Sequence, residues 1–98
     1  MRSRSKRVAD LASAHFSEHA LYQMSRRVLT IDQVRSVLAS PEGVSLLREG
    51  RIVVHGFISM GEPAKTYLLR VVVDVDPEPP VVFTVYKTSK IGKYRSRA

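Results

Sequence analysis

His19, Arg70 and Tyr86 are the residues best suited to acid–base chemistry on a phosphate group, and we predict that they are catalytic. Histidine takes up and releases protons near neutral pH, and His19 is expected in the first turn of a helix, where backbone amides bind anions. Arg70 is a charged residue inside an otherwise apolar strand and would stabilise developing negative charge. Tyr86 would orient an attacking hydroxyl or stack on a base.

A second group of residues is expected to bind phosphate. The last strand carries an aromatic hydroxyl and then becomes cationic, and no acidic residue follows Glu78. Basic side chains bind phosphate through charge and hydrogen bonds, and aromatic rings stack on the bases of single-stranded RNA. The predicted phosphate-binding residues are Arg27, Arg51, His55, Lys87, Lys90, Lys93 and Tyr94.

Each main candidate also has a structural interpretation. The ring of His19 would bond a backbone carbonyl and pin its helix to the sheet, and Arg27 would cap the last carbonyls of the same helix. Tyr86 would simply pack within its strand. Arg70 must reach an open face or an ionic partner, and Asp74, four residues later on the same strand face, is a candidate partner.

The sequence indicates no metal site and no cofactor. It contains no cysteine, which excludes disulfides and thiolate zinc sites. His15 and His19 have the spacing of two metal ligands on a helix, but no third ligand accompanies them in the sequence. Nor does it contain a phosphate-binding glycine loop, a supported Ser-His-Asp arrangement or a cluster of acids for two metal ions.

The 98 residues form one domain, and the formal net charge of +7 is concentrated at the two ends. Residues 1–7 carry four basic side chains and residues 87–98 carry five; residues 8–86 hold seven basic and nine acidic residues, a net charge of −2. Basic arms on a near-neutral body favour a polyanion, most often nucleic acid, with solubility alone as the alternative. We expect a flexible basic arm at 1–14, a single domain at 15–94 and a basic tail at 95–98.

Two helices are expected in the first half of the chain. The first begins after Ser17, a favourable N-cap, and the second after Thr30, which forms a capping box with Gln33. Pro41 ends the second helix. The side chains expected to face the core are Ala20, Leu21, Met24 and Val28 in the first helix, and Ile31, Val34, Val37 and Leu38 in the second.

The second half of the chain changes to the two-residue period of strands. Strands are expected at 44–48, 51–58 and 66–75 and from residue 81, and the short turns between them indicate an antiparallel arrangement. The fold class is therefore α+β, with two N-terminal helices packed on one face of a three- to four-stranded antiparallel sheet.

The period also assigns side chains to the two faces of the sheet. We expect the helices to cover Leu69, Val71 and Val73, and the other face to carry Arg70, Thr84 and Tyr86, together with Arg51 and His55 if the register allows. In the last strand, simple alternation puts Val81, Phe83 and Val85 on one side and Val82, Thr84 and Tyr86 on the other.

The residues Phe16-Ser17-Glu18-His19-Ala20, followed by Met24, Arg27 and Ile31, resemble the first-helix signature of the domain-of-unknown-function 4258 family. Thr84-Val85-Tyr86 and the basic tail after it are similar to that family's closing strand. The resemblance covers residues 15 to 94. Gln23 stands where many members carry an arginine, so a role for that arginine does not transfer to this chain.

This family is grouped with the RelE and BrnT toxins, so the resemblance implies two helices followed by an antiparallel sheet and cleavage of RNA without a metal. It further implies a cognate antitoxin protein as a partner. The alternative is a non-catalytic nucleic-acid-binding or protein-interaction module with the same fold. No apolar run reaches the roughly 18 residues that a membrane span needs, and we expect a cytoplasmic protein that binds RNA and no membrane.

Overall fold

The computed structural model describes residues 11–91 and has an α+β fold. Its elements are the 3-10 turn η1 (Leu11–Ser13), β1 (His15–Phe16), α2 (Glu18–Arg26), α3 (Ile31–Ala39), β2 (Gly43–Arg48), β3 (Arg51–Met60), β4 (Lys65–Asp74) and β5 (Val81–Thr88). Within residues 11–91, we find no helix with the length and apolar character needed to cross a membrane.

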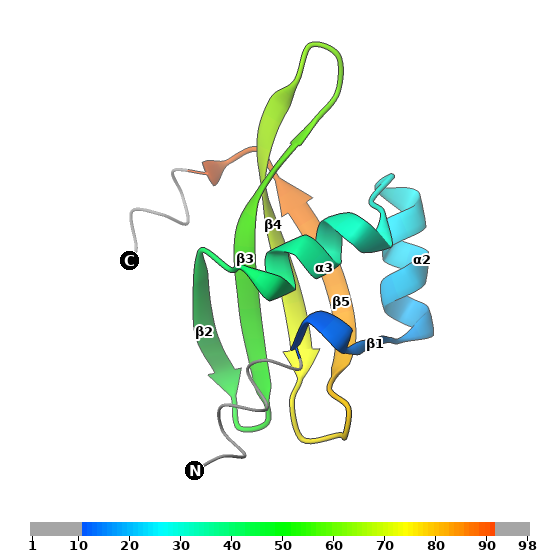
Figure 1. Cartoon of the computed structure of the whole chain (residues 1–98), viewed down its shortest axis with the longest axis vertical. Coiled ribbons are helices and arrows are strands. Elements are labelled where there is room, and N and C mark those ends of the chain that lie inside the picture. The colour runs from blue at the N-terminus through cyan, green and yellow to red at the C-terminus, as the bar shows by residue number, and fades with distance from the viewer. Residues whose placement is uncertain (1–10, 92–98) are drawn as a thin grey trace.

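The five strands form one mixed sheet in the order β1-β5-β4-β3-β2 (Figure 1). The pairs β2–β3, β3–β4 and β4–β5 are antiparallel, as expected. The prediction of a three- to four-stranded, purely antiparallel sheet is wrong, because β1 adds a fifth strand that runs parallel to β5. A strand of two residues, His15 and Phe16, is too short to show the alternation by which strands are recognised in a sequence.

The starts of both helices agree with the sequence prediction. The side chain of Ser17 accepts a hydrogen bond from the Ala20 amide at 3.0 Å and caps α2. Thr30 and Gln33 form the expected capping box of α3. The Gln33 amide donates to the Thr30 hydroxyl at 3.1 Å, and the Thr30 amide donates to Gln33 Oε1 at 2.9 Å. Each cap satisfies amide groups that have no partner inside the helix.

The end of α2 departs from the expected amphipathic pattern. Val28 has a φ of 56° and adopts the left-handed conformation that glycine usually provides just after a helix. The Val28 amide bonds the Ser25 carbonyl and the Leu29 amide bonds the Met24 carbonyl, the two bonds of a Schellman motif. The reversal turns Val28 outward, where it is 75% exposed, so its predicted place in the core is wrong.

The core lies between the helices and one face of the sheet. Figure 1 shows α3 crossing in front of β3 and β4, with α2 beside β5. The expected contact face is confirmed, because Leu69, Val71 and Val73 are all buried in this core. Leu21 and Ile31, predicted to be buried, are exposed on the outer side of the helices. The remaining buried members are Leu11, Ala14, Ala20, Met24, Leu29, Val34, Val37, Leu38, Val54, Val82 and Val85.

A β-bulge in β5 decides which of its side chains face the helices. Thr84 pairs with Val72 and Val82 pairs with Val73, so Phe83 is an extra residue in β5. Val82 and Val85 both face the core, whereas Thr84 and Tyr86 point the other way. Simple alternation along β5 was therefore wrong on the N-terminal side of the bulge.

Candidate functional site

Three of the predicted site residues lie side by side on the face of the sheet that is turned away from α3, which we call the distal face. In the register, His55 of β3 is opposite Arg70 of β4, and Arg70 is opposite Tyr86 of β5. We call these three the central row. All three are half-buried, and the Arg70 guanidinium carbon lies 5.7 Å from the centroid of the Tyr86 ring. With strands about 4.8 Å apart, the row spans about 10 Å.

The central row is set into apolar surroundings. Val53, Leu68 and Val72 are buried although they are not part of the core beneath the helices. Charged and polar groups in such surroundings act through a lower dielectric than in water, so their attraction for an anion is stronger. The flanking rows of paired residues are Val53, Val72 and Thr84 on one side and Phe57, Leu68 and Thr88 on the other.

Gly43 makes room for the imidazole of His55. The two residues are opposite each other in the β2–β3 register. A Cβ atom at Gly43 would lie 2.7 Å from Cε1 and 2.8 Å from Nε2 of His55. Real Cβ atoms essentially never come so close, so a larger residue at Gly43 would displace the ring.

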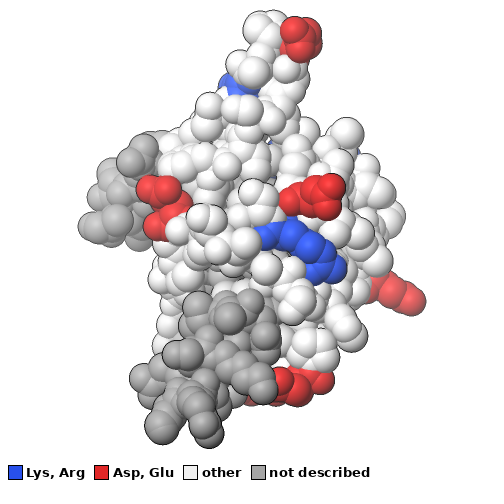
Figure 2. Space-filling view, in the orientation of Figure 1, with Lys and Arg blue, Asp and Glu red and all other residues white. Residues whose placement is uncertain are grey.

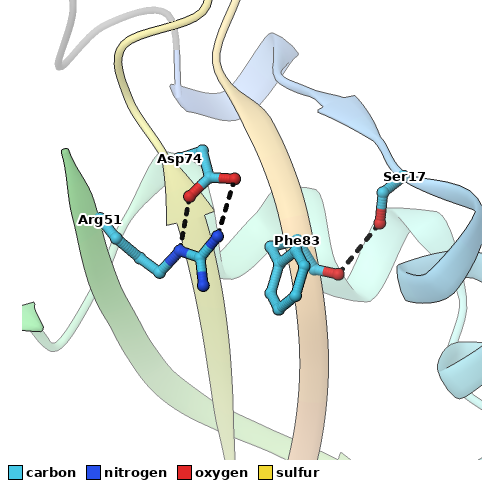
Figure 3. Close-up of polar contacts among 4 residues, drawn as sticks. All are labelled: Ser17, Arg51, Asp74 and Phe83. Carbon is cyan, nitrogen blue, oxygen red and sulfur yellow. Dashed lines mark hydrogen bonds and ion pairs between the residues drawn. The ribbon is translucent and has the colours of Figure 1, made fainter.

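A second group of interacting residues lies nearer the other end of β5, and we call it the Phe83 cluster: Ser17, His19, Arg51, Asp74 and Phe83 (Figure 3, which omits His19). Arg51 binds both carboxylate oxygens of Asp74, with Nε 2.6 Å from Oδ1 and Nη2 3.2 Å from Oδ2. The hydrogen bond and charge of Asp74 raise the pKa of Arg51, so it stays cationic. Asp74 is the residue that the sequence suggests as an ionic partner of Arg70. Both of its carboxylate oxygens are bound by Arg51.

Phe83 connects this ion pair to α2. Its ring centroid lies 4.1 Å from the Arg51 guanidinium carbon and 5.6 Å from the centroid of the His19 ring. Its carbonyl accepts a hydrogen bond of 2.9 Å from the Ser17 hydroxyl, which also caps α2. The bulge thus fixes the start of α2, and His19 with it, against β5. Asp74 of the Phe83 cluster and Arg70 of the central row are four residues apart, about 13 Å along β4. The cluster therefore does not bring His19 into contact with the central row.

Lys87 lies on the opposite side of the sheet from the central row. It pairs with the buried Leu69, and its Nζ donates to the Arg27 carbonyl at 3.1 Å and contacts Met60 Sδ at 3.4 Å. The Arg27 side chain donates to Gln23 Oε1 at 2.8 Å, within its own helix. Lys87 and Tyr86 therefore lie on opposite faces of the sheet, as adjacent residues of a strand do.

Among the remaining predicted residues, Lys90 is the one that the structure describes. Lys90 is exposed just after β5, and its amide bonds the Thr88 hydroxyl at 3.0 Å. Lys93 and Tyr94 are outside the described residues. Figure 2 shows the face that bears the helices: among the described residues, acidic groups are scattered over it, and basic groups form a streak near the middle and a small spot near the top. The described residues of this face therefore do not form a broad basic surface.

Two features of the site were not visible in the sequence pattern. Gly43 was assigned no role, because only the register shows that the His55 ring lies over it. Simple alternation puts Phe83 on the same side as Val81 and Val85, because the bulge has no marker in the sequence. Ser17 was recognised as a helix cap, and its second bond to Phe83 depends on contact between residues 66 positions apart.

The family described as Domain of unknown function (DUF4258) matches residues 16–87. The chain belongs to the DUF4258 family. The matched segment holds all residues of the central row and of the Phe83 cluster, and it ends before Lys90, Lys93 and Tyr94. No curated protein and no solved structure matches the chain.

The geometry of this DUF4258 domain suits binding of an anion better than binding of a metal. Residues 11–91 contain no group of three or more histidine, aspartate or glutamate residues that could hold a metal ion. The central row instead combines a cationic fork, an imidazole and a phenol, which together can donate to phosphate oxygens and move protons.

Proposed function

We propose that this DUF4258 domain binds RNA on the distal face of its sheet and cleaves it without a metal ion. The observation that supports this is the central row, in which His55, Arg70 and Tyr86 lie on neighbouring strands at one level of the sheet. The basic ends of the chain, with four basic residues in 1–7 and four in 90–98, add attraction for a polyanion.

In the proposed reaction the RNA supplies its own nucleophile. A base removes the proton of the 2′-hydroxyl, whose oxygen attacks the adjacent phosphorus. The bond to the 5′-oxygen then breaks and this oxygen receives a proton from an acid, which leaves a 2′,3′-cyclic phosphate. We propose that His55 and Tyr86 exchange these protons and that Arg70, which lies between them in the register, neutralises the phosphorane oxygens.

His19 has a different place in this proposal. It was a candidate acid or base, but it contacts Phe83 rather than the central row. Imidazole and phenyl rings beside the Arg51 guanidinium suit stacking of a neighbouring base. A His19→Ala change should therefore weaken RNA binding more than it slows cleavage of bound RNA, whereas His55→Ala should slow the cleavage step.

Two helices followed by four antiparallel strands, β2 to β5, are what similarity to RelE and BrnT toxins implies, and we propose that the domain is a toxin of this type. A cognate antitoxin would then inhibit it by covering the distal face. Growth arrest on expression, relieved by the product of an adjacent gene and lost in an Arg70→Ala variant, is the expected result in cells.

The alternative is a domain that binds RNA or a protein without cleaving anything. It is favoured by one observation: the central row holds a single histidine and no carboxylate. Such a domain would bind RNA with a strong salt dependence and leave its ends unchanged.

The deciding experiment incubates purified protein with end-labelled single-stranded RNA in EDTA and maps the product ends. Cyclic-phosphate ends that appear with wild-type protein and disappear with His55→Ala and Arg70→Ala support the nuclease. Arg26→Ala is the matched control, because Arg26 lies 5.8 Å over the Tyr22 ring on α2 in the same type of contact. Intact RNA with salt-dependent binding supports a non-catalytic RNA-binding domain. Absence of RNA binding refutes the nuclease and leaves the protein-interaction form of the alternative.

A further inference from the structure

Strand β2 forms an edge of the sheet whose outer side has no strand partner among residues 11–91. It carries three large apolar residues that are mostly in solvent: Val44 is 53% exposed, Leu46 is 74% exposed and Leu47 is 55% exposed. The opposite edge is different, because β1 has only two residues. Among residues 11–91, the sheet therefore ends in β2 on one side and, on the other, in β1 and the part of β5 beyond it.

Exposed edge strands are usually protected against pairing with other chains. The common devices are proline, lysine, an inward charge or a very short strand. The six residues of β2 include neither proline nor lysine, and the register shift lies after Leu46, towards the strand's end. Val44 and Leu46 pair with Val54 and Ile52, so they point to the helix side, but both stay exposed there. The strand is thus suited to adding a further strand.

The charges at the two ends of β2 indicate what that further strand is. Glu42 precedes the strand and Arg48 ends it. If two copies pair antiparallel about Ser45, the Glu42 end of each meets the Arg48 end of the other, twice by symmetry. The same pairing places Val44 opposite Leu46 of the second copy on one face, again twice, which adds apolar cross-strand contacts. The edge is therefore complementary to itself in both charge and apolar character.

We propose that β2 pairs antiparallel with β2 of a second copy of this chain, so that two five-stranded sheets become one continuous sheet. The two-fold axis of such a pair is perpendicular to the sheet, which keeps the faces aligned. Both central rows then lie on the same side, and their distal faces form one extended surface. The proposal rests on β2 alone and is independent of the RNA function.

The test measures the mass of the purified full chain by sedimentation equilibrium between about 1 and 200 μM. We expect a reversible dimer whose dissociation constant rises at least about tenfold, or 1.4 kcal/mol, in Leu46→Lys. Val28→Lys is the matched control, because Val28 is 75% exposed and lies outside the sheet. Its dissociation constant should match the wild type, and circular dichroism should show all three proteins folded.

A charge exchange tests the antiparallel pairing itself. Glu42→Arg and Arg48→Glu should each weaken the dimer, because each puts like charges together at both ends. A mixture of the two variants should dimerise again, since every end then meets an opposite charge. A wild-type protein that stays monomeric overturns the proposal, and β2 would then be available to pair with a strand of another protein. A dimer that is insensitive to Leu46→Lys, or a mixture that does not recover, overturns it as well.

Discussion

The imidazole of His55 lies where a side chain at Gly43 would be, with Cε1 and Nε2 at 2.7 and 2.8 Å from the position of a Cβ atom. Glycine therefore sets the position of the ring beside Arg70. We expect Gly43→Ala to displace the ring and to reduce RNA cleavage by about tenfold or more, because general acid–base catalysis depends on placement of the ring.

This effect should occur without unfolding. Ser45→Ala, two residues later on the same strand, is the control and should leave cleavage unchanged. In a double mutant with His55→Ala, Gly43→Ala should add little, because both changes remove the same group. Full additivity would show that Gly43 acts through something other than His55.

Arg70→Ala should weaken binding to single-stranded RNA and reduce the slope of log affinity against log salt by about 0.7, the value for one lost phosphate contact. Titrations at several salt concentrations with a fluorescent oligonucleotide measure both quantities. Arg26→Ala should change neither. An unchanged slope for Arg70→Ala would remove Arg70 from the phosphate-binding residues.

Asp74→Asn should strengthen RNA binding. The change removes a carboxylate from the distal face and releases Arg51 from an ion pair with a 2.6 Å contact. The cost in folding stability should be small, because partly exposed ion pairs contribute little. The same salt titration measures the RNA affinity of Asp74→Asn. Weaker binding would mean that the main role of the Arg51–Asp74 pair is to position Phe83, and not to reduce the positive charge that Arg51 offers to RNA.

Lys87→Met should reduce stability while leaving RNA affinity nearly unchanged. Methionine keeps the length of the side chain but loses the hydrogen bond to the Arg27 carbonyl at the end of α2. We expect a loss of about 1 kcal/mol in the free energy of unfolding, measured with urea. A large loss of RNA affinity with normal stability would instead return Lys87 to the phosphate-binding residues.

Val28→Gly should stabilise the domain by about 0.5–1 kcal/mol. Val28 has a φ of 56°, a conformation that is unfavourable for a β-branched residue and readily adopted by glycine. Its side chain is exposed, so little apolar contact is lost. Urea unfolding measures the change. A loss of stability would show that the contacts of the Val28 side chain outweigh its backbone strain.

The sequence by itself determined the parts of this protein that depend on neighbouring residues. Ser17 and the Thr30–Gln33 pair predicted the starts of both helices, since a cap involves residues three positions apart. The two-residue period predicted four strands and the face that carries Leu69, Val71 and Val73. It also named His55, Arg70 and Tyr86 as candidates without showing that they lie together.

Only the tertiary structure decided which of these residues meet. The register puts Arg70 between His55 and Tyr86. It also puts Asp74 opposite Arg51 of the neighbouring strand, where the two side chains form an ion pair. Register depends on turns, bulges and packing over the whole sheet, and a shift of one residue reverses every side chain. The extra residue at Phe83 is such a shift, and the signal for the two-residue β1 was too short to detect.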